Sequence, residues 1–121
     1  MRAVASILSI IVFLAFATTG AQRIIFNTVA SKAAGHLGFT KRTFQLVGLL
    51  EILGALGVLI GLAAKKGTFL ALLNEAAAAG LLVTMVAAVV VHLRKGDGIT
   101  GAAPALVLGA ACLVELVLRL V

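Results

Sequence analysis

The chain has almost no cysteine and no large polar aromatic side chains. Its 121 residues include one cysteine, Cys112, and neither tryptophan nor tyrosine. A single thiol excludes a disulfide relay within the chain, and a lone cysteine in an apolar run is most often a packing residue. Without Trp and Tyr no aromatic belt can set the depth of a membrane helix. Lysine, arginine and the few phenylalanines must set this depth instead.

Metal and haem motifs are also missing. The two histidines, His36 and His92, lie far apart in the sequence, and neither has a cysteine or a second histidine nearby. This spacing does not match the ligand patterns of zinc or haem sites. We therefore expect no metal ion. With no cysteine pair, no metal site and no room for a soluble catalytic module, an enzymatic function has little support.

Long apolar runs dominate what is present. Hydrophobic residues make up 63% of the chain, and the mean hydropathy is +1.25. Four stretches are long enough to cross a hydrocarbon core about 30 Å thick: residues 4–21, 46–64, 69–93 and 104–121. They are continuous, whereas barrel strands alternate, and they lack the polar stripe of a soluble helix. The sequence predicts an all-α integral membrane bundle of four transmembrane helices, forming one domain over residues 1–121.

The first run has a second interpretation. Arg2 precedes it, and small residues near its end resemble the cleavage site of a secretory signal. We interpret this run as a membrane helix that is kept.

Residues 22–45 are the only long connection between the predicted helices. Apolar residues at near-helical spacing are followed there by a lysine: Ile24, Ile25, Phe26, Val29 and Lys32. This pattern predicts a short amphipathic helix lying in the membrane interface. Gly35 and Gly38 are expected to end it.

The chain is basic, with a formal net charge of +6. Its lysines and arginines cluster at the ends of the predicted helices, where they meet lipid phosphates. The partner that this charge indicates is the lipid bilayer rather than nucleic acid. Four basic residues fall on the side of the termini and six on the other, which favours termini outside the cytoplasm.

Ionisable residues within the four apolar stretches are expected to have a functional role or to pair with one another, because charge is costly in lipid. Antiparallel threading places Glu51 and His92 toward the membrane face that carries Lys32. We expect a polar cluster there, joined by Thr18 or Thr19, although His92 at a helix end also fits a position in the headgroups. At the opposite face, Glu115 and Arg119 are four residues apart with the acid first, which predicts a structural ion pair.

Glycines share the helix face of Glu51. Gly54, Gly57 and Gly61 lie on this face, and the last two have the GxxxG spacing that allows close helix packing. We expect them to form a helix-packing or partner interface.

Three segments resemble the DoxX-like family of small four-helix membrane proteins: HLGF from His36, LVGLLEILGALGVLIG over residues 46–61, and MVAAVVVHLRKGD over residues 85–97. The family pattern places a lysine after the first helix, a glutamate in the Gly-rich second helix and His-Leu-Arg near the end of the third. Lys32, Glu51 and His92 match these positions, and we hypothesise that they line a ligand-binding pocket at one membrane face.

The resemblance implies two functions. The first is a non-catalytic accessory subunit of a larger assembly in a bacterial plasma membrane, with a membrane-protein partner or a homo-oligomer. The second is a quinone- or lipid-binding component of a membrane redox system, with a quinone or lipid as the only bound cofactor. A small transporter is less well supported, because the first helix has no acid and the chain has no Trp or Tyr.

Overall fold

The described residues form five helices and no strands. The computed structural model describes residues 2–62, 64–65 and 67–120. The helices follow in order along the chain: α1 Arg2–Ile25, α2 Thr28–Leu37, α3 Lys41–Ile60, α4 Phe69–Arg94 and α5 Gly98–Leu120. All except α2 are long and apolar enough to span a membrane. The predicted all-α fold with four membrane-spanning helices and a short connecting helix is confirmed.

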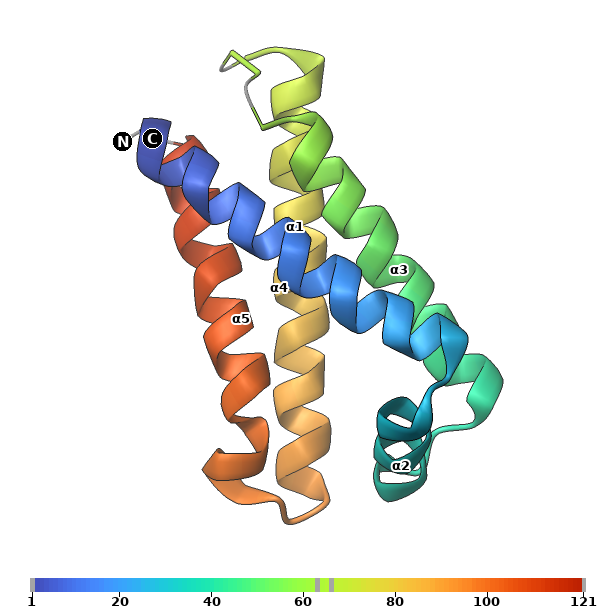
Figure 1. Ribbon diagram of the computed structural model, residues 1–121. Helices are drawn as coiled ribbons and strands as arrows, with labels where there is room; N and C mark the ends of the chain where they lie inside the picture. Colours follow the sequence, from blue (N-terminus) through green and yellow to red (C-terminus); the bar gives the residue numbers. More distant parts are fainter. Residues whose placement is uncertain (1, 63, 66, 121) are drawn as a thin grey trace.

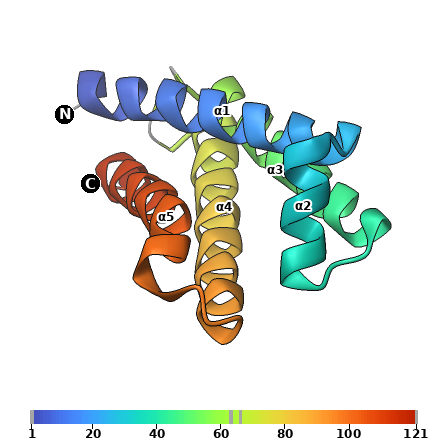
Figure 2. The same ribbon diagram turned by 60° about the horizontal axis from the view of Figure 1, so that its bottom comes forward.

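The four long helices run alternately between two ends of the molecule (Figure 1). Both termini and the turn between α3 and α4 lie at one end, and α2 and the turn between α4 and α5 lie at the other. Helix α1 runs obliquely across the others and packs chiefly on α3, while α4 packs chiefly on α5 (Figure 2). We refer to the end that carries α2 as the α2 end.

Helix boundaries differ from the predicted ones where end residues are polar or small. Helix α3 begins at Lys41 rather than at residue 46, because Thr40 caps it by accepting a hydrogen bond from the Thr43 amide at 3.2 Å. It ends at Ile60 rather than at residue 64. Helix α5 begins at Gly98 rather than at residue 104, so Pro104 lies inside the helix. Hydropathy does not detect these weakly apolar end turns.

The connection between α1 and α2 also differs from the prediction. Ile24 and Ile25 belong to α1, and the chain turns at Phe26, whose φ is 56°. Asn27 then caps α2, accepting a hydrogen bond from the Ala30 amide at 2.9 Å. The short helix therefore starts later than its apolar residues suggested.

Gly38, and not Gly35, ends α2. Gly38 has the left-handed φ of 80°, and the amide of Phe39 donates to the Ala34 carbonyl at 2.9 Å. This is the Schellman arrangement, which glycine adopts without strain. Gly35 lies within the helix.

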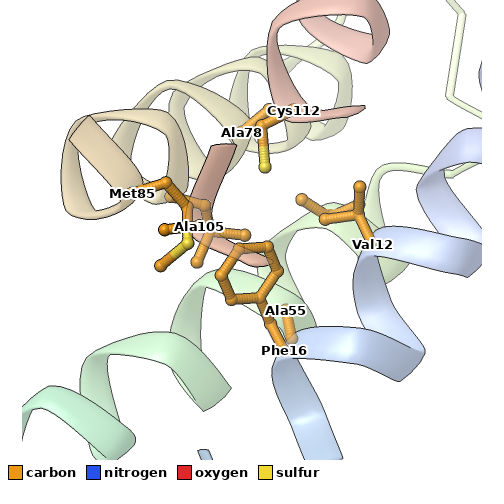
Figure 3. Packing of buried hydrophobic residues seen from close by; sticks show 9 residues of the cluster. Val12, Phe16, Ala55, Ala78, Met85, Ala105 and Cys112 are labelled. Carbon is orange, nitrogen blue, oxygen red and sulfur yellow. The ribbon is translucent and has the colours of Figure 1, made fainter. Parts of the chain in front are cut away.

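The core lies where the four long helices meet. All four contribute side chains to one buried cluster, which includes Val12 and Phe16 of α1, Ala55 of α3, Met85 of α4 and Cys112 of α5 (Figure 3). Each of these side chains is at most 4% exposed. A second, smaller cluster of Ala30, Ala34 and Phe44 fastens α2 to the start of α3. Helix α2 is therefore packed at the edge of the bundle, outside its main core.

The glycines predicted to pack do so within the chain. Gly54 lies against Leu81, Gly57 against Ala77 and Gly61 against Asn74, all on α4. A Cβ on Gly57 would lie 2.7 Å from the Cβ of Ala77. This face of α3 is therefore occupied by α4.

A closer contact, between α1 and α3, involves two other glycines. A Cβ on Gly48 would lie 2.7 Å from both the Gly20 carbonyl oxygen and the Arg23 Cβ. Only glycine allows the two backbones to approach this closely.

We expect Gly48→Ala to lower the free energy of unfolding by about 1 to 3 kcal/mol, because the added methyl meets backbone that cannot yield. Gly80→Ala is the matched control, since no atom lies within 4 Å of a Cβ there. It should leave stability unchanged or raise it by up to about 1 kcal/mol. Unfolding in mixed detergent, followed by circular dichroism, measures both. Equal changes in the free energy of unfolding for Gly48→Ala and Gly80→Ala would contradict the tight α1–α3 crossing.

Candidate functional site

Glu51 is a fully buried acid at the centre of α3. It is 1% exposed and forms an ion pair with Arg23 of α1. Thr19 of α1 donates a hydrogen bond to its Oε2 at 3.0 Å. Thr19 and Arg23 are four residues apart and so share one face of α1. The carboxylate therefore receives both its charge partner and a hydroxyl donor from a single neighbouring helix.

The α1–α3 crossing creates this arrangement. Gly20 and Gly48 meet there, next to Thr19 and one turn from Glu51. The guanidinium of Arg23 also lies over the ring of Phe44, with its Cζ 5.1 Å from the ring centroid. This cation–π contact holds the same guanidinium group that pairs with the acid. The ion pair is thus fixed from two sides.

A pocket of about 130 Å³ opens beside this ion pair. Its walls come mainly from α3 and α4, and the residues at the end of α2 close part of it. Most lining side chains are apolar: Leu37, Phe39, Phe44, Val47, Met85, Ala87, Ala88 and Val91. Arg23, Glu51, Thr84 and His92 supply the polar groups. The part of α4 that lines the pocket extends from Thr84 to His92, an advance of eight residues or about 12 Å along the helix. The pocket is a narrow apolar cleft with polar groups at both ends.

His92 is bound to the turn between α4 and α5. Its Nδ1 lies 2.7 Å from Asp97 Oδ2, and His36 Nε2 of α2 lies 2.6 Å from Asp97 Oδ1. Hydrogen bonds from His92 and His36 lower the pKa of Asp97 below its ordinary value of 3.8. Asp97 therefore stays ionised at neutral pH and joins α2 to the end of α4.

The three residues predicted to bind a ligand are not equally placed. Glu51 and His92 line the same pocket, although each is hydrogen-bonded to other residues and not to its counterpart. Lys32 is exposed on α2 and does not line the pocket. Thr19 bonds to Glu51, whereas Thr18 donates to the Leu14 carbonyl of its own helix at 2.7 Å.

Sequence reasoning missed three residues of this site: Arg23, His36 and Asp97. One signal existed for Asp97, which is the only one of four acidic residues outside the apolar runs and lies five residues after His92. Arg23 gave none, because an arginine at the end of a membrane helix is expected in the headgroups.

A second polar cluster lies at the end that carries the termini. Arg119 Nε lies 3.3 Å from Glu115 Oε1, so the two side chains predicted to pair are within ion-pair distance. Ser9 of α1 donates to the same oxygen at 2.6 Å, and Arg119 also donates to the Leu62 carbonyl at 2.6 Å. Glu115 is fully buried. This cluster binds α1 and the turn that follows α3 to α5.

Within residues 2–62, 64–65 and 67–120, no group of three or more His, Cys, Asp or Glu side chains is arranged to hold a metal ion.

A family model described as the DoxX-like family matches residues 7–114 of the 121. The chain belongs to the DoxX-like family. No curated protein and no solved structure matches it. In this DoxX-like protein every residue that lines the pocket lies within the matched range, whereas Glu115 and Arg119 lie beyond it. The pocket is therefore part of the region that relates the chain to its family.

We expect Arg23→Met to lower the free energy of unfolding by on the order of 3 kcal/mol, because it leaves Glu51 buried without a charge partner. The double variant Arg23→Met/Glu51→Met should be less destabilised than Arg23→Met alone. Lys32→Met, which removes an exposed cation, is the control and should change stability by less than about 0.5 kcal/mol. A double-mutant cycle, built from the free energies of unfolding of these variants in mixed detergent, measures the coupling between Arg23 and Glu51. Additive losses would show that the pair is not coupled.

The lowered pKa of Asp97 predicts a pH effect on stability. An acid whose pKa is lower in the folded state stabilises the fold above its unfolded pKa, and this stability is lost as the pH falls through the folded pKa. The stability advantage of the wild type over Asp97→Asn should be full above the ordinary value of 3.8 and should shrink below it. Thermal unfolding in zwitterionic nanodiscs over this range measures the difference. A constant difference below pH 3.8 would contradict it.

Proposed function

We propose that this DoxX-like protein binds an amphipathic ring molecule of the membrane, a quinone or a lipid of similar chemistry, in the pocket between α3 and α4. One observation carries the proposal: an apolar cleft within the bundle is lined by His92 and by the ion pair of buried Glu51 with half-buried Arg23. Ligand pockets combine largely apolar walls with a few placed polar groups. Here the apolar walls suit a ring, and the polar groups suit its oxygen substituents.

The size of the pocket limits what enters it. Its volume is about 130 Å³, and an apolar protein cavity of about 150 Å³ accommodates benzene. The pocket therefore holds one substituted ring and not a whole lipid. Any hydrocarbon tail must lie outside the pocket, along the apolar surfaces that the helices present to the bilayer.

The depth of the pocket suits a ligand that arrives from the membrane. Glu51 is the eleventh residue of the 20-residue helix α3, so it lies about 15 Å from the start of that helix at the α2 end. His92 is two residues from the end of α4. The cleft thus leads from the α2 end toward the middle of the bundle. The exposed basic residues at that end, including Lys32 and Arg94, are placed to anchor it among lipid phosphates.

The accessory-subunit function, with a membrane-protein partner or a homo-oligomer, stays a prediction. The glycine face that was expected to form either a helix-packing or a partner interface packs against α4 of the same chain. This packing favours ligand binding over assembly as the role of α3.

We expect Ala88→Leu to abolish ligand binding while the protein still folds, because three added carbons fill a pocket of about 130 Å³ at a half-buried wall position. Ala76→Leu is the matched control, since Ala76 is exposed on the same helix and lies outside the pocket. Native mass spectrometry of the protein released from its own membranes in mild detergent detects the bound molecule. Wild type and Ala76→Leu should each carry one small amphipathic adduct that Ala88→Leu lacks.

Two outcomes would contradict the proposal. An adduct retained by Ala88→Leu would place the molecule elsewhere on the protein. A stoichiometric larger protein without any small molecule would support the accessory-subunit function instead.

A further inference from the structure

Asp97 fixes the protonation of both histidines. An ionised carboxylate only accepts hydrogen bonds, so each histidine nitrogen facing it must carry the proton. His92 faces Asp97 with Nδ1 at 2.7 Å, and His36 faces it with Nε2 at 2.6 Å. Neutral His92 is therefore the Nδ1–H tautomer, and neutral His36 is the Nε2–H tautomer. The same carboxylate imposes opposite tautomers on the two rings.

The tautomer of His92 determines what the pocket offers to a ligand. With its proton on Nδ1, the neutral ring has a lone pair on Nε2, which makes no hydrogen bond to any described residue. The charged residues that line the same pocket, Arg23 and Glu51, form an ion pair with each other. The Thr84 hydroxyl donates to the Gly80 carbonyl at 2.9 Å. Nε2 is therefore a hydrogen-bond acceptor on a pocket-lining side chain that no described residue uses.

We propose that His92, positioned by Asp97, selects ring molecules that bear a hydroxyl group, such as phenols and hydroquinones, over rings that carry only carbonyl or ether oxygens. This inference rests on the proposed function of the pocket. A hydroxyl donates to the Nε2 lone pair in apolar surroundings. A carbonyl or ether oxygen there would face the lone pair with another lone pair, and a buried acceptor without a donor is costly.

The first experiment needs no ligand. The chain has only two histidines, so ¹⁵N-histidine labelling in nanodiscs gives two imidazole spin systems, which His36→Gln assigns. At about pH 8.5, where an unperturbed imidazole is neutral, ring ¹⁵N shifts distinguish a protonated from an unprotonated nitrogen. The expected result is His92 protonated at Nδ1 and His36 at Nε2. His92 protonated at Nε2 would overturn the proposal.

Variants of Asp97 test its positioning role. Asp97→Asn should remove the tautomer preference of His92, because an amide can donate as well as accept. Asp97→Glu keeps a carboxylate and should restore the preference at least in part. If Asp97 affected packing alone, the His92 tautomer preference would not be lost in Asp97→Asn and restored in Asp97→Glu. A His92 tautomer unchanged in Asp97→Asn would overturn the role assigned to Asp97.

The second experiment tests selection with two probes that differ in one O–H group, para-decylphenol and para-decylanisole. Each probe is titrated into wild-type nanodiscs, with empty nanodiscs as the blank. The phenol should bind at least about fivefold more tightly than its methyl ether, because one net hydrogen bond changes an affinity by about this factor. In Asp97→Asn the ratio should fall toward one, and in Asp97→Glu it should recover.

The outcomes separate the two proposals. Equal binding of both probes by the wild type would overturn the selection by His92 and leave the proposed pocket function standing. Binding of neither probe would overturn the pocket function and the selection together, whatever tautomer the spectra show.

Discussion

The ion pair between Glu51 and Arg23 is the interaction on which the pocket depends. A carboxylate that is 1% exposed in an apolar bundle must be paired, because unpaired charge is costly there. Its partner comes from α1, so α1 must cross α3 closely enough for the two side chains to meet. Gly20 and Gly48 permit that crossing. The requirement to pair one acid thus links the glycines, the crossing and the polar part of the pocket.

The same requirement operates at the other end of α1. There Ser9 bonds to Glu115, which also pairs with Arg119. Helix α1 is therefore bound to α3 near its C-terminal end and to α5 near its N-terminal end. These two attachments account for its oblique course across the bundle (Figures 1 and 2). Polar contacts, rather than apolar burial alone, set the direction of this helix, as expected where lipid competes equally for apolar side chains.

Much of the fold followed from the sequence, because long apolar runs leave a membrane chain few structures other than helices. The helix ends did not follow, since caps such as Asn27 and Thr40 act through single hydrogen bonds that hydropathy does not register. In the site, helical depth placed Glu51 and His92 at one pocket. Their partners Arg23 and Asp97 did not follow, because these depend on how helices rotate and cross, and a single sequence does not specify those angles.

The central claim is that a ring molecule occupies the cleft between α3 and α4. Photo-cross-linking with a decylphenol that carries a diazirine on its ring, followed by peptide mass spectrometry, locates the ring directly. The account predicts cross-links on residues that line the cleft, such as Val47, Ala88 and Val91. Cross-links confined to the exposed side of α4, at Val83 and Val86, would contradict it.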